Sequence, residues 1–140
     1  MVKEEKNLGV TVSADMKWER QCIEAVKKAN KMLCLIKRNF QDKSKDTVMP
    51  LYKSLVRLHL EYCCQVWSPY LSKDINLIEG VQRKAAKLIK DIKHLSYERL
   101  ENLGLSRLTT RRVRSDLTQT FKIINGIDKV EESLFFEIDK

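Results

Sequence analysis

Glycine, proline and long apolar segments are all scarce in this chain of 140 residues. Four glycines and two prolines are too few for the many tight turns of an all-β sandwich. No uninterrupted apolar run approaches the ~20 residues of a membrane span, and the charged start MVKEEKNLGV does not resemble a secretory signal. Hydrophobic residues nevertheless make up 43% of the chain, enough to build a core. We expect a mainly helical domain, nuclear or cytoplasmic, that is neither secreted nor membrane-bound.

Catalytic and metal-binding motifs are also missing. The glycines stand alone, so no phosphate-binding loop exists, and the acids show no paired-aspartate turn for Mg²⁺. His59 and Cys63 are four residues apart and could form half of a zinc site, but no CxxC or HxxxH supplies the other half. A Cys–His nucleophile is conceivable, yet the sequence does not bring its members together. We therefore expect no catalytic residues, no metal and no cofactor, and reduced, largely buried thiols at Cys22, Cys34, Cys63 and Cys64.

The spacing of apolar side chains predicts a helical bundle of about five helices preceded by one short strand. NLGVTVS at residues 7–13 alternates like a strand, and we expect its pairing partner to lie outside this chain. Beyond it, apolar residues recur every three or four positions, which is typical of amphipathic helices. The expected helices cover 16–39, a segment from 46 or 47 to a stop near 67–70, then 73–91, 96–103 and 109–125. The inward face expected for the last helix consists of Val113, Leu117, Phe121 and Ile124.

The charge of the chain is strongly uneven. Residues 1–126 carry 25 Lys+Arg and 14 Asp+Glu, a net charge of +11, whereas residues 127–140 form an acidic tail with a net charge of −3. A basic body attracts polyanions, so nucleic acid is one expected partner; a well-solvated helical protein is the alternative.

Two clusters of cations are the candidate phosphate contacts. The arginine cluster lies at the start of the last helix, where the guanidinium fork and the helix N-terminus both favour phosphate oxygens; it comprises Arg107, Arg111, Arg112 and Arg114. A second basic run, at spacings of one or three residues, comprises Arg83, Lys84, Lys87, Lys90 and Lys93. Its candidate contacts, called the lysine run below, are Lys84, Lys87 and Lys90. Placed side by side, the two clusters would follow a nucleic-acid backbone without reading bases. Each could instead be an ordinary solvated helix face.

Four segments in succession resemble a known family. They are NLGVTVSADMKWERQCIEAVKKANKMLCLIKRNF, LYKSLVRLHLEYCCQVWSPY, LIEGVQRKAAKLI and LSYERLENLGLSRLTTRRVRSDLTQTFKIINGID. Together they resemble the C-terminal part of reverse transcriptases from non-LTR retrotransposons, most nearly those of vertebrate LINE elements. The resemblance implies a palm-edge strand at 1–13, a thumb-like helical domain at 14–126 that grips duplex backbone, and the acidic tail at 127–140.

The departures from this family carry their own expectations. The catalytic Tyr-Ala-Asp-Asp turn and the endonuclease domain are not in this sequence, so we expect neither polymerisation nor cleavage. Leu58 stands where family members often have proline, which favours a second helix that continues through Tyr62. The resemblance implies weak, sequence-independent binding to RNA–DNA or DNA duplex. The alternatives are a helical protein-interaction adaptor, self-association through a surface that a palm would cover, or a decayed remnant without selected activity.

Overall fold

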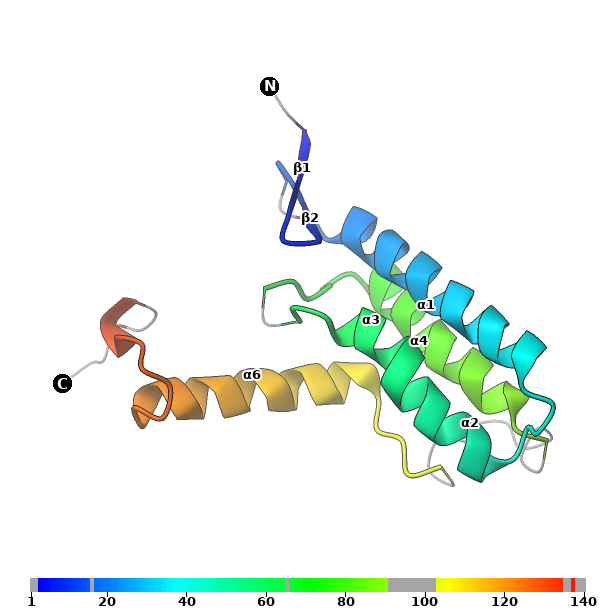
Figure 1. Cartoon of the computed structure of the whole chain (residues 1–140). Coiled ribbons are helices and arrows are strands. Elements are labelled where there is room, and N and C mark those ends of the chain that lie inside the picture. Colours follow the sequence, from blue (N-terminus) through cyan, green and yellow to red (C-terminus); the bar gives the residue numbers. More distant parts are fainter. Residues whose placement is uncertain (1–2, 16, 65, 91–102, 135–136, 138–140) are drawn as a thin grey trace.

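The computed structural model describes residues 3–15, 17–64, 66–90, 103–134 and 137, and it confirms a mainly helical fold (Figure 1). Among these residues, a small N-terminal hairpin is followed by four helical regions and a short 3-10 helix. The helix expected at 96–103 falls almost wholly outside the described residues. None of the described helices combines the length and the apolar character needed to cross a membrane.

The N-terminal segment is a two-stranded hairpin, which corrects the expectation of one strand paired outside the chain. Strands β1 (Glu4–Asn7) and β2 (Val10–Ser13) pair antiparallel. The turn between them places Leu8 at φ 50° and Gly9 at φ 80°, and positive φ at both central residues matches the twist of the flanking strands. Val10 belongs to the hydrophobic core, so the hairpin and the helices form one folded unit.

Helices α1 (Glu19–Asn39) and α4 (Ser72–Leu88) lie side by side and run parallel. Near their starts, Lys73 Nζ is 2.9 Å from Glu19 Oε1; just past their ends, the Lys90 amide donates to the Lys43 carbonyl at 3.3 Å. Their buried faces include small side chains that permit close packing, among them Ala25, Ala29, Ala85 and Ala86.

The third side of the bundle is one continuous helical stretch made of α2 (Lys45–Leu51), the π-helical η1 (Tyr52–Val56) and α3 (Arg57–Glu61). Pro50 lies inside α2, and the π-helical segment begins two residues later. The proline ring and its missing N–H disturb regular α-helical bonding at this point. The stretch continues past Leu58 but ends at Glu61, short of the stop expected near residues 67–70. Tyr62, with ψ 123°, and Cys63, with φ 53°, leave helical geometry and end it. Tyr52 Oη donates to Gln82 Oε1 at 2.8 Å, and this hydrogen bond connects the stretch to α4.

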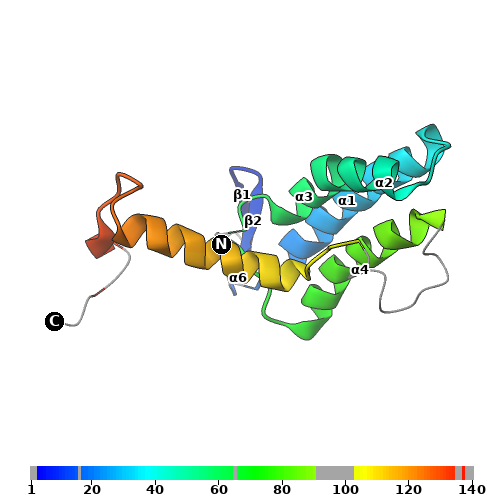
Figure 2. The same ribbon diagram turned by 90° about the horizontal axis from the view of Figure 1, so that it is seen from below.

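Helix α6 (Leu108–Ile124) projects away from the bundle, which corrects the expected direction of its apolar face (Figures 1 and 2). Its buried residues are Leu108 and Arg112, both near its start. The side chains expected to face inward are instead 51–65% exposed: Val113, Leu117, Phe121 and Ile124. The acidic tail turns back at the far end, where Gln119 Nε2 donates to Asp128 Oδ2 at 2.6 Å, before the short 3-10 helix η3 (Glu132–Leu134).

Candidate nucleic-acid interface

Arg112 is buried at the junction between α6 and the bundle, which corrects its expected place on the surface. Only 4% of the residue is exposed. Its Nη1 donates to the Trp67 carbonyl at 3.0 Å and its Nη2 to the Leu60 carbonyl at 2.6 Å, while the guanidinium lies 4.3 Å above the Trp67 ring. Burial lowers the pKa of Arg112 from its usual value. Arg112 therefore closes the C-terminal end of α3 and fixes the connection from α3 to α4.

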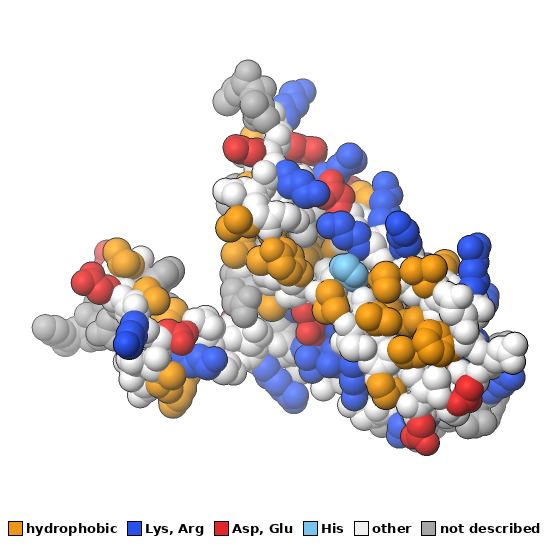
Figure 3. All heavy atoms as spheres, viewed as in Figure 1, with side chains coloured by type: hydrophobic (Ala, Val, Ile, Leu, Met, Phe, Trp, Pro, Cys, Tyr) orange, Lys and Arg blue, Asp and Glu red, His pale blue; other side chains and the backbone are white. Residues whose placement is uncertain are grey.

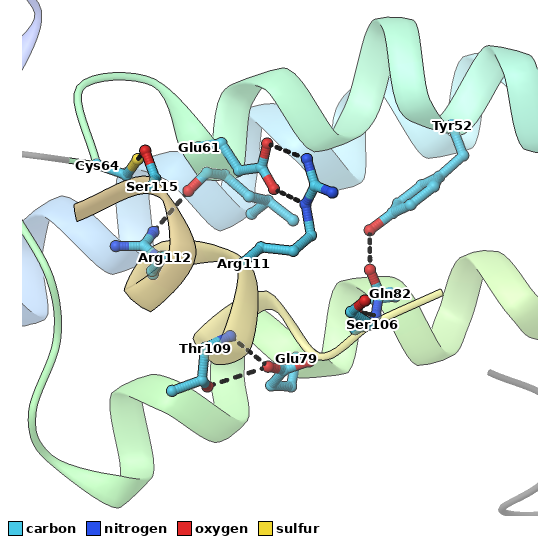
Figure 4. A network of polar contacts seen from close by, with 11 residues as sticks. Tyr52, Glu61, Cys64, Glu79, Gln82, Ser106, Thr109, Arg111, Arg112 and Ser115 are labelled. Atoms are coloured by element: carbon cyan, nitrogen blue, oxygen red, sulfur yellow. Dashed lines mark hydrogen bonds and ion pairs between the residues drawn. The ribbon is translucent and has the colours of Figure 1, made fainter. Parts of the chain in front are cut away.

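Arg111 is held in an ion pair with Glu61 (Figure 4). Its Nε is 2.5 Å from Glu61 Oε1 and its Nη2 is 3.3 Å from Oε2, a two-pronged contact that raises the pKa of Arg111. The side chain is 36% exposed. A phosphate would have to displace Glu61 to reach the fork of Arg111, so this residue is a poorer candidate than its sequence position suggests.

The N-terminus of α6 already has an anionic partner. Glu79 Oε1 accepts hydrogen bonds from the Thr109 amide at 3.1 Å and from Thr109 Oγ1 at 3.2 Å (Figure 4). A carboxylate at this position satisfies an otherwise unpaired helix donor and is favoured by the helix dipole. The expected phosphate site at this helix end is thus occupied by a side chain of the protein itself.

Arg107 and Arg114 are the members of the arginine cluster that are exposed. With Arg111 they follow a spacing of four and three residues, so all three lie on one side of the helix start, whereas Arg112 points elsewhere. The structure divides the predicted cluster into a buried clamp, an ion-paired arginine and two surface cations.

The lysine run faces solvent, as the sequence predicts. Lys84, Lys87 and Lys90 are exposed, as is Arg83, while Gln82, Ala85 and Ala86 between them are buried. Lys90 lies near Asp42. The pKa of Asp42 is lowered mainly by hydrogen bonds from Thr47 and Ser44, and to a smaller extent by the charge of Lys90.

A further row of cations on α1 was not among the predicted site residues. Lys27, Lys28, Lys31, Lys37 and Arg38 are all exposed. Figure 3 shows Lys and Arg side chains following the outer edge of the bundle along α1. Because α1 and α4 run parallel, the last-turn cations Lys37, Arg38 and Lys87 lie at the same end of the bundle. The sequence could have identified this row, because its cations occupy the polar positions of the amphipathic period of α1. It could not show that α4 lies beside α1, which is a property of the folded chain.

In the described part of the chain, no cluster of three or more His, Cys, Asp or Glu side chains could hold a metal ion. The four cysteines are thiols; Cys22 and Cys64 are buried, but Cys34 is exposed, contrary to the expectation of largely buried thiols at that position. Burial raises the pKa of the Cys22 thiol to about 12. Comparison with protein-family models, curated proteins and solved structures finds no match to this chain.

Proposed function

We propose that this chain is a thumb-like fragment of a LINE-type reverse transcriptase that binds the backbone of a nucleic-acid duplex without sequence preference and without polymerase activity of its own. The observation that supports it best is the placement of exposed cations on two neighbouring parallel helices, α1 and α4, in a chain of net charge +8. The ordered resemblance of four sequence segments to that family is the second support.

The candidate backbone contacts are exposed cations on three parts of the structure. They are Lys84, Lys87 and Lys90 on α4, the α1 row of Lys27, Lys28, Lys31, Lys37 and Arg38, and Arg107 and Arg114 beside the start of α6. Long lysine side chains on rigid helices can approach phosphates but present no fixed fork that would distinguish bases. Binding of this kind depends on release of counterions and weakens steeply with salt.

The direct test is fluorescence anisotropy of the full chain with a labelled RNA–DNA duplex over a series of salt concentrations. The triple variant K84Q/K87Q/K90Q should bind more weakly, and its log–log salt slope should be smaller by about 3, near 0.9 for each lost phosphate contact. The matched control K6Q/K17Q/K129Q changes the net charge equally at exposed positions outside α4.

Two results would contradict the proposal. One is the absence of binding at low salt by a chain whose circular dichroism shows it to be folded. The other is an equal loss of affinity in the α4 variant and in the control, because that would reduce the effect to net charge alone.

The second candidate function is a helical protein-interaction adaptor, favoured by the exposed apolar side chains of α6. In that case the cations would serve only hydration, and a partner would stay bound at high salt, since apolar contacts are not screened.

A further inference from the structure

Helix α6 carries an apolar stripe on its solvent-exposed surface. Val113, Leu117, Phe121 and Ile124 follow steps of four, four and three residues, which places them within a sector of roughly 80° around the helix. They are exposed by 53%, 65%, 60% and 51%. Four large apolar side chains aligned in this way are rarely left in water without a partner surface.

The side of α6 that meets the bundle is a different and largely polar one. Leu108 and Arg112 are buried against the bundle, and Ser115 Oγ is 3.8 Å from Cys64 Sγ. These residues recur at steps of four and three, on a face turned well away from the apolar stripe. The apolar stripe is therefore separate from the face by which α6 contacts the bundle.

The charge is basic at the start of α6 and acidic in the chain that follows the helix, although the last turn of α6 itself carries Lys122. Arg107, Arg111 and Arg114 lie at its start, roughly a quarter-turn from the apolar stripe, and Arg107 and Arg114 are exposed. The chain beyond its far end is acidic, with Asp128, Glu131 and Glu132 against Lys129 alone before residue 133. Two such helices placed antiparallel bring the basic start of each to the acidic end of the other, whereas a parallel arrangement brings like charges together.

From this pattern we infer that the stripe binds a second copy of the same chain, as an antiparallel α6–α6 pair related by a two-fold axis. The spacing of the stripe is self-complementary in that arrangement. With the axis midway between Leu117 and Phe121, Leu117 of each copy faces Phe121 of the other, and Val113 faces Ile124. A closed two-fold contact uses the same surface on both copies, so it ends at the dimer.

The size of the contact predicts a weak dimer. The stripe spans 11 residues of rise, about 17 Å of helix, and a single helix pair of this length falls below the ~1,200 Å² of standard stable interfaces. We therefore expect reversible dimerisation that depends on protein concentration. High salt should remove the charge contribution but not the apolar one.

Sedimentation velocity of the full chain over a wide concentration range tests the dimer itself. The wild type should pass from monomer to dimer as concentration rises, and L117E/F121E should remain monomeric with an unchanged circular dichroism spectrum, because both side chains are exposed. The matched control L35E/L58E introduces the same charges at exposed apolar positions on α1 and α3 and should still dimerise. A folded wild type that stays monomeric throughout, or a dimer lost only in the control, overturns the inference.

Disulfide trapping tests the direction of the helices. In a background of C34S/C63S, which removes the two more accessible thiols, a mixture of V113C and I124C chains should yield the mixed disulfide in preference to either homodimer. Preference for V113C–V113C and I124C–I124C would indicate parallel pairing and refute the arrangement. Neither experiment contains nucleic acid, so failure of the duplex-binding proposal would leave these results unchanged.

Discussion

Replacing Arg112 with alanine tests whether the junction between α6 and the bundle is built as described. The substitution leaves the Leu60 and Trp67 carbonyls without the donors that now reach them at 2.6 and 3.0 Å. A buried acceptor that loses its partner costs about 1–3 kcal/mol, so the two together cost about 2–6 kcal/mol. The lost contact with the Trp67 ring adds about 2 kcal/mol in a desolvated site.

Part of this loss is offset, because R112A also removes the cost of keeping a charged guanidinium out of water. That cost amounts to several kcal/mol for a buried ion. We therefore expect the free energy of unfolding to fall by about 3 kcal/mol. Urea unfolding followed by circular dichroism measures it. R112K keeps the charge but not the fork that reaches two carbonyls at once, and it should fall between wild type and R112A.

The matched control is R114A, an exposed arginine on the same helix, which should change stability by no more than about 0.5 kcal/mol. A loss below about 1 kcal/mol for R112A would show that water satisfies both carbonyls once the side chain is gone. The reasoning that makes Arg112 a structural clamp would then fail, and its predicted role at the surface would have to be reconsidered.

Three further predictions concern other sites. L8N should raise the melting temperature, because asparagine tolerates the φ of 50° that costs leucine about 1–2 kcal/mol; a lowered temperature would refute this account of the turn. Hydrogen bonds from Thr47 and Ser44 lower the pKa of Asp42 from 3.8, so its contribution to stability is present above that pH and is lost on acidification. D42N should therefore reduce the fall in unfolding free energy at low pH, and an unchanged fall would contradict this. Iodoacetamide at pH 8 should modify exposed Cys34 rapidly and Cys22, with its pKa of about 12, only after unfolding; early labelling of Cys22, mapped by mass spectrometry, would argue against its burial.

Three of the helices could be predicted from the sequence to within a few residues because their signal is local. Apolar spacing gave 16–39, 73–91 and 109–125, and the structure has Glu19–Asn39, Ser72–Leu88 and Leu108–Ile124. The hairpin was missed because β1 is the polar sequence EEKN, whose side chains are all exposed and show no alternation. Its turn also lacks the Asn-Gly or Asp-Gly pair that would have marked it.

The site was only partly predictable, because the sequence does not say which face of α6 meets the bundle. The apolar stripe through Leu117 suggested one face, but the contact is made by Leu108 and Arg112. That Arg112 lies four residues after an apolar Leu108 was a faint hint of burial, since both then share a helix side. The exposure of Lys84 and its neighbours was predictable from the spacing of apolar residues in α4. A charged side chain on the opposite face stays in solvent whichever element packs against the apolar face.

Helix α6 is held against the bundle only near its start, so a small change in its direction there is enlarged at its far end. The helix is 17 residues long, about 25 Å, and its buried residues lie within its first five positions. A change of about 10° in its angle at the Arg112 junction would displace the far end, with the acidic tail, by about 4 Å. Small rearrangements where Glu61, Glu79 and Trp67 hold the helix start are thereby enlarged at its tip, which makes the tip the place where a label would report them most sensitively.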